Sequence, residues 1–505
     1  MNVVVFTTWV IFEFIPSIHA EIIESHLQKG HKVKVIVCDS QLPSCFYPHR
    51  DLYDKKDFSS FKSKEVCLTC QLTWRHTLTE ELKIKKEDIV SLTPVPKDLV
   101  IPDFNSIKEV EDCHYKEIPI GAGIMSSLIS LTRDVDIDIV KYRKELEAMY
   151  KNAVISILTM EKLTQSFNPD KVYIFNGRRA ERRAVLEFCE VKDIDYDTWE
   201  IAQSLKHYYL VNRTLPHDPV RFAQDAIKLF NEPSIPKEEK IKQAEEWYQL
   251  KRYGKNEDRP NDINYKKLMN DDDISKLNID TKKINIGVFI SSEDEIASLG
   301  QKIWPFKYRQ VDTINIILNH FKEDKTIHFY LRIHPNLRNI TSLENDKLHQ
   351  LSSPLLTVIP ASSQLNSYSL MEACDKVVCF SSTIGLEATF WKKPSILFGT
   401  SSYKHIPNSI HNAETLDELF ALIKHPNLPP KDKEAAMIYS YSLQNKGKLI
   451  KRLDIYDKQI VSVYSKYKLL YPIYNLYKKS SFLSKIVRKL EIEKMTKKAL
   501  VFFSK

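Results

Sequence analysis

The stretch 3–37 decides the fold, because it holds one complete strand–helix–strand unit. Val3-Val4-Val5-Phe6 is a short apolar run typical of a buried strand. Residues 14–29 then repeat apolar side chains at helical spacing, and Gly30 closes the helix. Val33 to Val37 resumes a strand. Such a unit predicts a parallel sheet covered by helices.

The same alternation continues along the chain. Val172-Tyr173-Ile174-Phe175 predicts another strand, followed by a helix over 178–190. From Ile284 onward the pattern predicts strands at 286–290, 327–333, 355–359, 377–380 and 395–398, and helices at 311–323, 366–374 and 383–392. A charged helix over 236–254 and a polar stretch over 255–283 separate the two parts.

We therefore predict an α/β protein with two Rossmann-like domains that face a central cleft. The predicted parts are an amino-terminal domain (1–235), a charged helix and linker (236–283), a carboxyl-terminal domain (284–425), and a helical return with a basic tail (426–505). Ligands of such sheets bind beyond the carboxyl ends of the strands, so the cleft is the expected site.

The composition excludes glycine-loop nucleotide binding. The chain has 10 glycines in 505 residues, where average usage gives roughly 35. It holds no GxxxxGK[ST] sequence, which excludes a P-loop enzyme. Gly121-Ala122-Gly123 lacks the third glycine of a dinucleotide fingerprint, because Ser126 stands there. No apolar run approaches 18 residues, so we expect no membrane-spanning helix.

Hydroxyl residues occupy the point where one strand ends and the next helix begins, at Ser381-Ser382-Thr383. A helix amino terminus carries unpaired N–H groups and about half a positive charge. This helix has no acidic residue before Glu387, whereas the helix after Ser292 opens with three carboxylates. We predict that the hydroxyls bind a phosphate, with the small Gly385 keeping the approach open. Plain helix capping is the alternative.

A second candidate is Leu331-Arg332-Ile333-His334-Pro335-Asn336, where Pro335 stops a predicted strand. Arg332 and His334 share one face of that strand. A cation and an imidazole on one face suit a phosphate or a leaving group. A structural histidine is the alternative.

Arginines gather after the strand 172–175, in Asn176-Gly177-Arg178 and at Arg179, Arg182 and Arg183. The helix dipole disfavours cations in the first turns of a helix. Either these arginines form a solvated face paired with Glu181 and Glu187, or some point into the cleft toward an anionic group. Asn176 and Arg178 are the candidates for an acceptor or anion site.

Carboxylates gather in Thr132–Asp138, after an apolar stretch. One that projects into the cleft would serve as a general base, and Asp134 is our candidate. Helix capping by aspartate is the alternative.

Four of the eight cysteines, Cys38, Cys45, Cys67 and Cys70, lie early in the chain. A CxxC pair with two further thiols fits a structural zinc ion or an iron–sulfur cluster. The first pair is spaced too widely for a zinc ribbon, so reduced cysteines on strand and loop are the favoured alternative.

The tail carries the positive charge of the chain. Residues 451–505 hold 14 Lys/Arg and 4 Asp/Glu, and the first 450 residues hold 60 basic and 62 acidic residues. Apolar side chains recur at helical spacing over 482–490, with Lys485, Arg488 and Lys489 between them. This pattern predicts a helix that lies on an anionic membrane. Packing on the body is the alternative, and nucleic acid is not an expected partner.

These motifs together resemble the bacterial capsule and surface-polysaccharide biosynthesis proteins, which are glycosyltransferases of the two-Rossmann-domain (GT-B) type with an HP motif and a serine motif. The resemblance is carried by Ser291–Glu295, Arg332–Asn336, Ser381–Ala388 and Trp391–Ser395. Asn176-Gly177-Arg178 and the early cysteines extend it into the amino-terminal half. The tail lies outside it.

The resemblance implies that His334 and Ser381–Thr383 hold the phosphate of a nucleotide-sugar donor, with Arg332 beside them. It implies that His334 assists the leaving group and that Glu387 faces the ribose or the sugar. Transfer would need no metal, and a glycan or glycolipid acceptor would bind the amino-terminal domain. With the tail, it implies a cytoplasmic enzyme on the inner face of the cell membrane.

Two alternatives stay open. One is a polyol-phosphate transferase or a nucleotide-sugar epimerase on the same fold. The other is a catalytically silent membrane scaffold.

Overall fold

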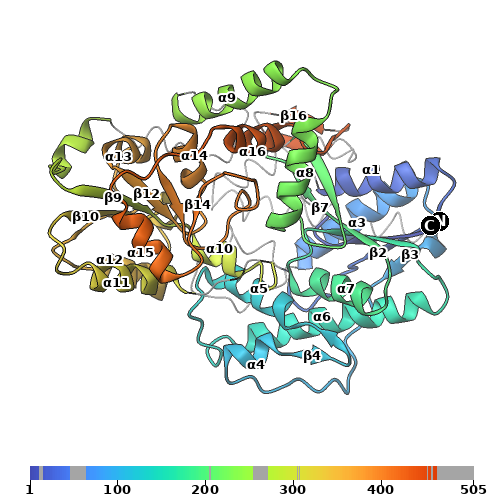
Figure 1. The fold of residues 1–505 in the computed structure, drawn as a ribbon. Coiled ribbons are helices and arrows are strands. Elements are labelled where there is room, and N and C mark those ends of the chain that lie inside the picture. The colour runs from blue at the N-terminus through green and yellow to red at the C-terminus, as the bar shows by residue number, and fades with distance from the viewer. Residues whose placement is uncertain are drawn as a thin grey trace. The chain divides into compact units, whose positions relative to one another are not determined.

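The computed structural model describes residues 1–10, 15–45, 64–203, 206–253, 271–303, 305, 308–451, 453–456 and 459–462. Figure 1 draws the helices and strands along the chain. The chain forms two compact units. Unit 1 comprises Met1–Pro94, Phe167–Asp170 and Ile450–Lys505, and unit 2 comprises Val95–Ser166 and Lys171–Leu449. The predicted amino-terminal domain contributes residues to both units, and the predicted domain boundaries stay predictions.

Unit 1 is built on the predicted strand–helix–strand stretch. β1 (Asn2–Thr7) and β2 (Lys32–Val37) pair in parallel, and α1 (Ile15–Gln28) connects them. Gly30 turns the chain between α1 and β2 at φ +71°, a left-handed conformation that favours glycine. The unit is completed by β3 (Ile89–Ser91) beside β2, by α3 (Lys64–His76), and by the short helices η1 (Thr77–Glu81) and η2 (Lys86–Asp88).

The first described residues of the basic tail form strands, whereas a helical tail was predicted. β16 (Leu453–Tyr456) and β17 (Gln459–Ser462) form an antiparallel hairpin. The amphipathic helix predicted over 482–490 lies outside the described residues.

The described part of unit 2 contains two larger sheets and one small antiparallel pair of strands. In the first, β6 (Lys171–Phe175) and β7 (Tyr196–Ile201) are parallel, and β8 (His207–Asn212) and β15 (Lys448–Leu449) continue the sheet in antiparallel pairs. β6 leads into α7 (Ala180–Val191), as predicted, and α7 packs against α5 (Gly121–Thr132) and α6 (Arg143–Thr164). Three small elements, α4 (Ile107–Glu111), β4 (His114–Tyr115) and β5 (Ile118–Pro119), precede α5.

The second sheet of unit 2 has six strands, all parallel, in the order β11-β10-β9-β12-β13-β14. The strands are β9 (Ile284–Phe289), β10 (Ile327–Arg332), β11 (Leu356–Ile359), β12 (Lys376–Cys379), β13 (Ser395–Leu397) and β14 (His411–Asn412). The chain builds outward from β9 on one side and then returns to its other side at β12. This Rossmann-like order places the expected ligand crevice beyond the carboxyl ends of β9 and β12.

Helices alternate with these strands. They are α10 (Glu293–Ala297), α11 (Gln310–His320), α12 (Leu343–Gln350), α13 (Ser367–Ala373), α14 (Ile384–Phe390) and α15 (Leu416–Lys424), with the short helices η4 (Asp271–Leu277) and η5 (Pro335–Leu337). The strands and helices predicted for this part are confirmed to within three residues at each end. α12 and α15 were not predicted.

Three further helices of unit 2 pack together and contact α14, a helix of the second sheet. α8 (Pro219–Asn231) and α9 (Lys237–Tyr253) both contact α16 (Glu434–Asn445), and α16 contacts α14. The ring of Tyr248 in α9 stacks on Phe390 in α14, with ring centroids 4.0 Å apart. Both rings belong to one apolar core that also contains Leu386 and Tyr439.

Within the described part of the chain, no helix is both long and apolar enough to cross a membrane.

Candidate functional site

His334 stands directly beyond the carboxyl end of β10, where Pro335 begins a short 3-10 turn. Its Nδ1 accepts a hydrogen bond from the amide of Asn336 at 3.2 Å. An accepting Nδ1 places the proton of a neutral imidazole on Nε2. Burial lowers the pKa of His334 to about 4, and the charges of Arg332 and Lys251 act in the same direction. His334 is therefore a neutral group that presents an N–H donor.

Arg332 does not have the role predicted for it. Its side chain is 2% exposed, and its Nη1 donates to the carbonyl of Pro360 at 2.7 Å. Nη2 donates to the carbonyl of Ser363 at 3.2 Å. Burial lowers the pKa of this guanidinium to about 10. Because both terminal nitrogens are engaged with the main chain, Arg332 holds the loop after β11 rather than a phosphate.

The serine segment lies between β12 and α14, as predicted. The Ser382 hydroxyl accepts a bond from the amide of Ile384 at 3.4 Å, and Thr383 Oγ1 donates to Glu387 at 2.8 Å. Ser381 Oγ is buried and has no hydrogen-bond partner among the described residues. The Ser382 hydroxyl therefore accepts from the first amide of α14, the Thr383 hydroxyl orients Glu387, and the Ser381 hydroxyl has no partner among the described residues.

Gly385 serves packing rather than ligand approach, which corrects the prediction. A Cβ atom at this position would lie 2.4 Å from Cys379 Sγ and 2.7 Å from the Tyr403 hydroxyl. A side chain at position 385 would therefore collide with the core that packs on α14.

Glu387 is enclosed by the protein's own donors. It is 3% exposed, and its carboxylate accepts from Lys251, Thr383 and the hydroxyl of Tyr368. Burial opposes ionisation, but the Lys251 ammonium and these hydrogen bonds hold the pKa of Glu387 below its usual value. Glu387 therefore orients Lys251 and Thr383 and does not itself present an open oxygen to a ribose.

Lys251 is a site residue that sequence reasoning missed. It comes from α9, which the sequence presents as a charged helix leading away from the first domain. A signal was present, since Trp247 and Tyr248 lie one turn before Lys251 on an otherwise charged helix. Large aromatic side chains at helical spacing indicate the face that packs.

Asn176 and Arg178 form a separate polar group at the carboxyl end of β6. Arg178 Nε donates to Asn176 Oδ1 at 3.2 Å, and Nη1 donates to Ser298 Oγ at 3.1 Å, directly after α10. The Asn176 amide nitrogen donates to Glu200, at the end of β7. Burial raises the pKa of Glu200, while Asn176 and Arg178 act against that rise. Glu200 was not among the predicted residues.

The neighbouring arginines are paired, yet they are not solvated. Arg183 Nε lies 2.6 Å from Glu187, and Arg182 lies 3.3 Å from Glu181. Arg182 is 1% exposed and its guanidinium lies over the ring of Phe175. These arginines belong to the interior of unit 2.

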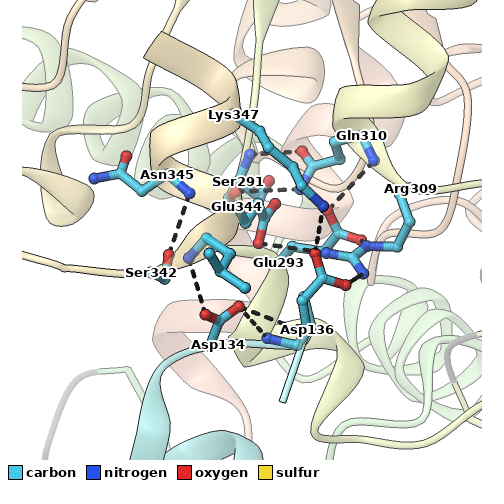
Figure 2. Close-up of polar contacts among 12 residues, drawn as sticks. Asp134, Asp136, Ser291, Glu293, Arg309, Gln310, Ser342, Glu344, Asn345 and Lys347 are labelled. Carbon is cyan, nitrogen blue, oxygen red and sulfur yellow. Dashed lines mark hydrogen bonds and ion pairs between the residues drawn. The ribbon is translucent and has the colours of Figure 1, made fainter. Parts of the chain in front are cut away.

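Asp134 accepts hydrogen bonds at the start of a helix, which supports the capping alternative, and its assignment as a general base stays a prediction. Figure 2 shows its carboxylate below α12. Oδ2 accepts from the amide of Leu343, the first residue of α12, at 3.0 Å, and Oδ1 accepts from the amides of Val135 and Asp136 at 2.8 and 3.1 Å. Both oxygens thus accept main-chain hydrogen bonds, as helix capping by aspartate requires.

The surrounding charges in Figure 2 form a closed network. Asp136 lies 2.8 Å from both Arg309 and Lys347, and Arg309 also binds Glu293. Burial and the neighbouring carboxyl of Glu293 raise the pKa of Glu344 well above its usual range. The network joins the segment after α5 to α11 and α12.

The four early cysteines line one small cavity in unit 1, together with Trp9, Trp74 and Arg75. Burial, followed by the neighbouring Cys38, raises the pKa of Cys70 to about 12. Among the described residues, no group of three or more His, Cys, Asp or Glu side chains is arranged to hold a metal ion. The assignment of a zinc ion or an iron–sulfur cluster to these thiols stays a prediction.

A family model described as "Capsule polysaccharide biosynthesis protein" matches residues 292–407. The matched segment contains His334, the serine segment and Glu387, so the predicted resemblance to capsule biosynthesis proteins is confirmed there. Lys251 lies outside it. No curated protein sequence matches the chain at a significant level.

Among solved structures, the chain is similar to two KpsC proteins of Thermosulfurimonas dismutans. The beta Kdo 2,4 transferase is 14% identical over 54% of this chain and 79% of its own, with a TM-score of 0.32. The beta Kdo 2,7 transferase is 14% identical over 68% and 98%, with a TM-score of 0.34. UDP-GlcNAc 2-epimerase from Neisseria meningitidis is 14% identical over 88% and 96%, with a TM-score of 0.24. With TM-scores below 0.5, these likenesses carry no argument about function.

Proposed function

We propose that this protein is a glycosyltransferase that moves a sugar from a nucleotide-sugar donor to a surface-glycan acceptor in capsule-type polysaccharide biosynthesis. One observation carries the proposal. The segment that matches the capsule biosynthesis family is the segment in which His334 and Ser381 stand beyond the carboxyl ends of β10 and β12. Ligands of open α/β sheets bind at this edge.

The donor phosphate would be held by neutral and backbone donors. His334 offers Nε2–H, and Ser381 offers a hydroxyl that no described residue engages. As the bond between the sugar and the phosphate breaks, negative charge grows on the leaving nucleotide, and preorganised donors stabilise that charge. We propose that transfer itself requires no metal ion, so that a chelator leaves the rate unchanged.

The acceptor side of the reaction stays open. The hydrogen bond from the amide of Leu343 to Asp134 supports a capping role for this carboxylate, so we assign no base. We propose that the acceptor is a glycan or glycolipid and that the basic tail keeps the enzyme on the inner face of an anionic membrane. Residues 463–505 hold 11 Lys/Arg and 2 Asp/Glu, and anionic lipids attract such segments by about 1 kcal/mol per basic residue near the surface.

A nucleotide titration tests the central claim. CMP, CDP, UDP, GDP and ADP are titrated against the wild type and His334→Ala by calorimetry. We expect the wild type to bind nucleotides that carry one particular base. The variant should bind the same nucleotide about 10-fold more weakly, a change in binding free energy of about 1.4 kcal/mol. If no nucleotide binds the wild type, the proposed function is wrong.

The matching nucleotide sugars then identify the reaction. Transfer to an added lipid-linked acceptor supports the proposal, whereas an isomerised sugar nucleotide formed without acceptor identifies an epimerase.

A truncation tests the membrane role of the tail. Removal of residues 463–505 leaves the β16–β17 hairpin in place and is expected to release the protein from anionic liposomes. Replacement of Lys485, Arg488 and Lys489 by glutamine is the charge-only control.

A further inference from the structure

Lys251 is held at the donor site by a helix that lies outside the segment matched by the family model. Its Nζ lies 3.2 Å from Thr383 Oγ1 and binds the Glu387 carboxylate. These contacts join α9, which ends the amino-terminal half of unit 2, to the first turn of α14. The cation therefore stands at the same turn as the unengaged hydroxyl of Ser381.

Packing contacts of the neighbouring residues hold Lys251 in position. Tyr248, one turn before Lys251, stacks on Phe390 and donates its hydroxyl to the carbonyl of Ala436 at 2.9 Å. Trp247 places its ring 4.8 Å from Lys251 Nζ. The α9 backbone is thus fixed against α14 and α16, and the position of the ammonium is fixed with it.

Lys251 is the accessible end of a buried pair. The Lys251 side chain is 27% exposed and that of Glu387 is 4% exposed. Glu387 also receives hydrogen bonds from Thr383 and Tyr368, so its charge is satisfied from several sides. An ammonium group has three N–H donors, and the carboxylate and Thr383 account for two of them. A partly exposed cation with a donor to spare suits an anion that arrives from solvent.

Electrostatics link Lys251 to the predicted motif as well. Its charge acts on His334, the other donor at this edge of the sheet. Since His334 is neutral and Arg332 is engaged with the loop after β11, the HP motif itself contributes no free cation to the site. A phosphate bound between β10 and β12 needs its neutralising charge from another element.

We propose that Lys251 supplies this charge and binds the phosphate of the nucleotide donor, with Glu387 orienting it. This inference rests on the proposed function and adds to it a residue from α9. Arg252, the next residue, pairs with Glu372 and lies over Trp391, so it is engaged elsewhere.

The test compares a nucleotide with its nucleoside. Wild type and Lys251→Met are titrated by calorimetry with the nucleotide that the wild type binds, with the corresponding nucleoside, and with inorganic phosphate and pyrophosphate. We expect the variant to lose at least 10-fold in affinity for the nucleotide, while its affinity for the nucleoside stays within 2-fold. Lys251→Arg is expected to retain most of the nucleotide affinity. Binding of pyrophosphate alone as tightly as the nucleotide would identify a free-phosphate site instead of a donor site and would overturn the inference.

Lys424→Met is the matched control, because Lys424 is ion-paired with Asp324 before the amino end of β10, the opposite edge of the same sheet. If the methionine variant is less stable than this control, Lys251→Gln, which can still donate to Glu387 and Thr383, replaces it. Unchanged nucleotide affinity in folded Lys251→Met or Lys251→Gln overturns the inference and leaves the proposed function standing. Equal losses for nucleotide and nucleoside also overturn it, because they indicate packing alone. A wild type that binds no nucleotide overturns both.

Discussion

The tetrapeptide His-Pro-Asn-Leu occurs twice in the chain, at 334–337 and at 425–428. The two turns share their local geometry. In each, the histidine Nδ1 accepts from the amide of the asparagine two residues later, at 3.2 Å. In each, the leucine is buried in the same core of the second sheet of unit 2.

Their surroundings differ. His334 follows a buried strand and lies near the charges of Arg332 and Lys251, at the edge where Ser381 stands. His425 follows the end of α15 and is exposed. Four residues determine how the turn folds, and the place of the turn in the sheet determines what its imidazole can contact. The predictions below test that difference.

The largest effect is expected from removal of the His334 side chain, with His425 as its control. His334→Ala should lower the rate of sugar transfer on the order of 100-fold, because a positioned donor at the leaving group is lost. His425→Ala removes the same side chain from the same local turn and should leave the rate within 2-fold. Initial rates with the donor identified by titration measure both. Equal effects in the two variants would mean that the turn acts only in folding.

The next effect concerns stability. Gly385→Ala places a Cβ atom against Cys379 and Tyr403 and should reduce the free energy of unfolding by about 1–3 kcal/mol. Denaturant unfolding measures it. Adding Cys379→Ala removes the nearest contact and should recover part of the loss. If Gly385→Ala instead weakens nucleotide binding at unchanged stability, the glycine serves ligand approach after all.

A smaller loss of stability is expected at Asp134. Asp134→Ala removes the acceptor for the first amide of α12 and should cost about 1 kcal/mol of unfolding free energy. The transfer rate at saturating donor should not change. A fall of 100-fold in that rate, with donor affinity retained, would restore Asp134 as the general base.

The smallest effect is a pH dependence. The pKa of His334 is lowered in the folded protein to about 4, whereas an unfolded histidine titrates near pH 6.5. Between these values the unfolded state binds more protons, so this group makes stability fall as the pH is lowered from about 6.5 toward 4. His334→Gln should reduce that slope in denaturant unfolding measured at several pH values. A slope unaltered by His334→Gln, or reduced equally by His425→Gln, would contradict the assignment of a neutral, buried imidazole.

Much of the architecture could be predicted because it depends on local patterns. Apolar runs of four to six residues gave β1, β2, β6 and the central strands of the second sheet, and apolar residues at helical spacing gave α1, α7 and α11. The antiparallel β8 and the short α12 and α15 were missed. α12 carries only two leucines, whereas β8 and α15 carry apolar patterns that were not recognised. The hydroxyl turn at 381–383 and the strand-end histidine were also visible, since both follow directly from where a strand stops.

The roles inside the site depended on contacts that the sequence does not show. Arg332 looks available from its place beside His334, yet three-dimensional packing turns it toward the carbonyls of Pro360 and Ser363. Gly385 and Asp134 likewise acquire their roles from residues distant in the chain, Tyr403 and Leu343. Lys251 enters the site because α9 packs on α14 through Tyr248 and Phe390.

The sequence by itself determined the α/β class, the absence of glycine-rich phosphate loops and the two segments that end at the ligand edge, because each of these is a local property of neighbouring residues. Only the tertiary structure decided which histidine of two identical turns belongs to the site, which charged groups are already engaged, and which lysine stands beside the hydroxyls. Those properties depend on groups brought together from separate positions, 28 residues apart for Arg332 and Pro360 and 132 for Lys251 and Thr383. The energy that selects them is that of burial and hydrogen bonding in the folded protein.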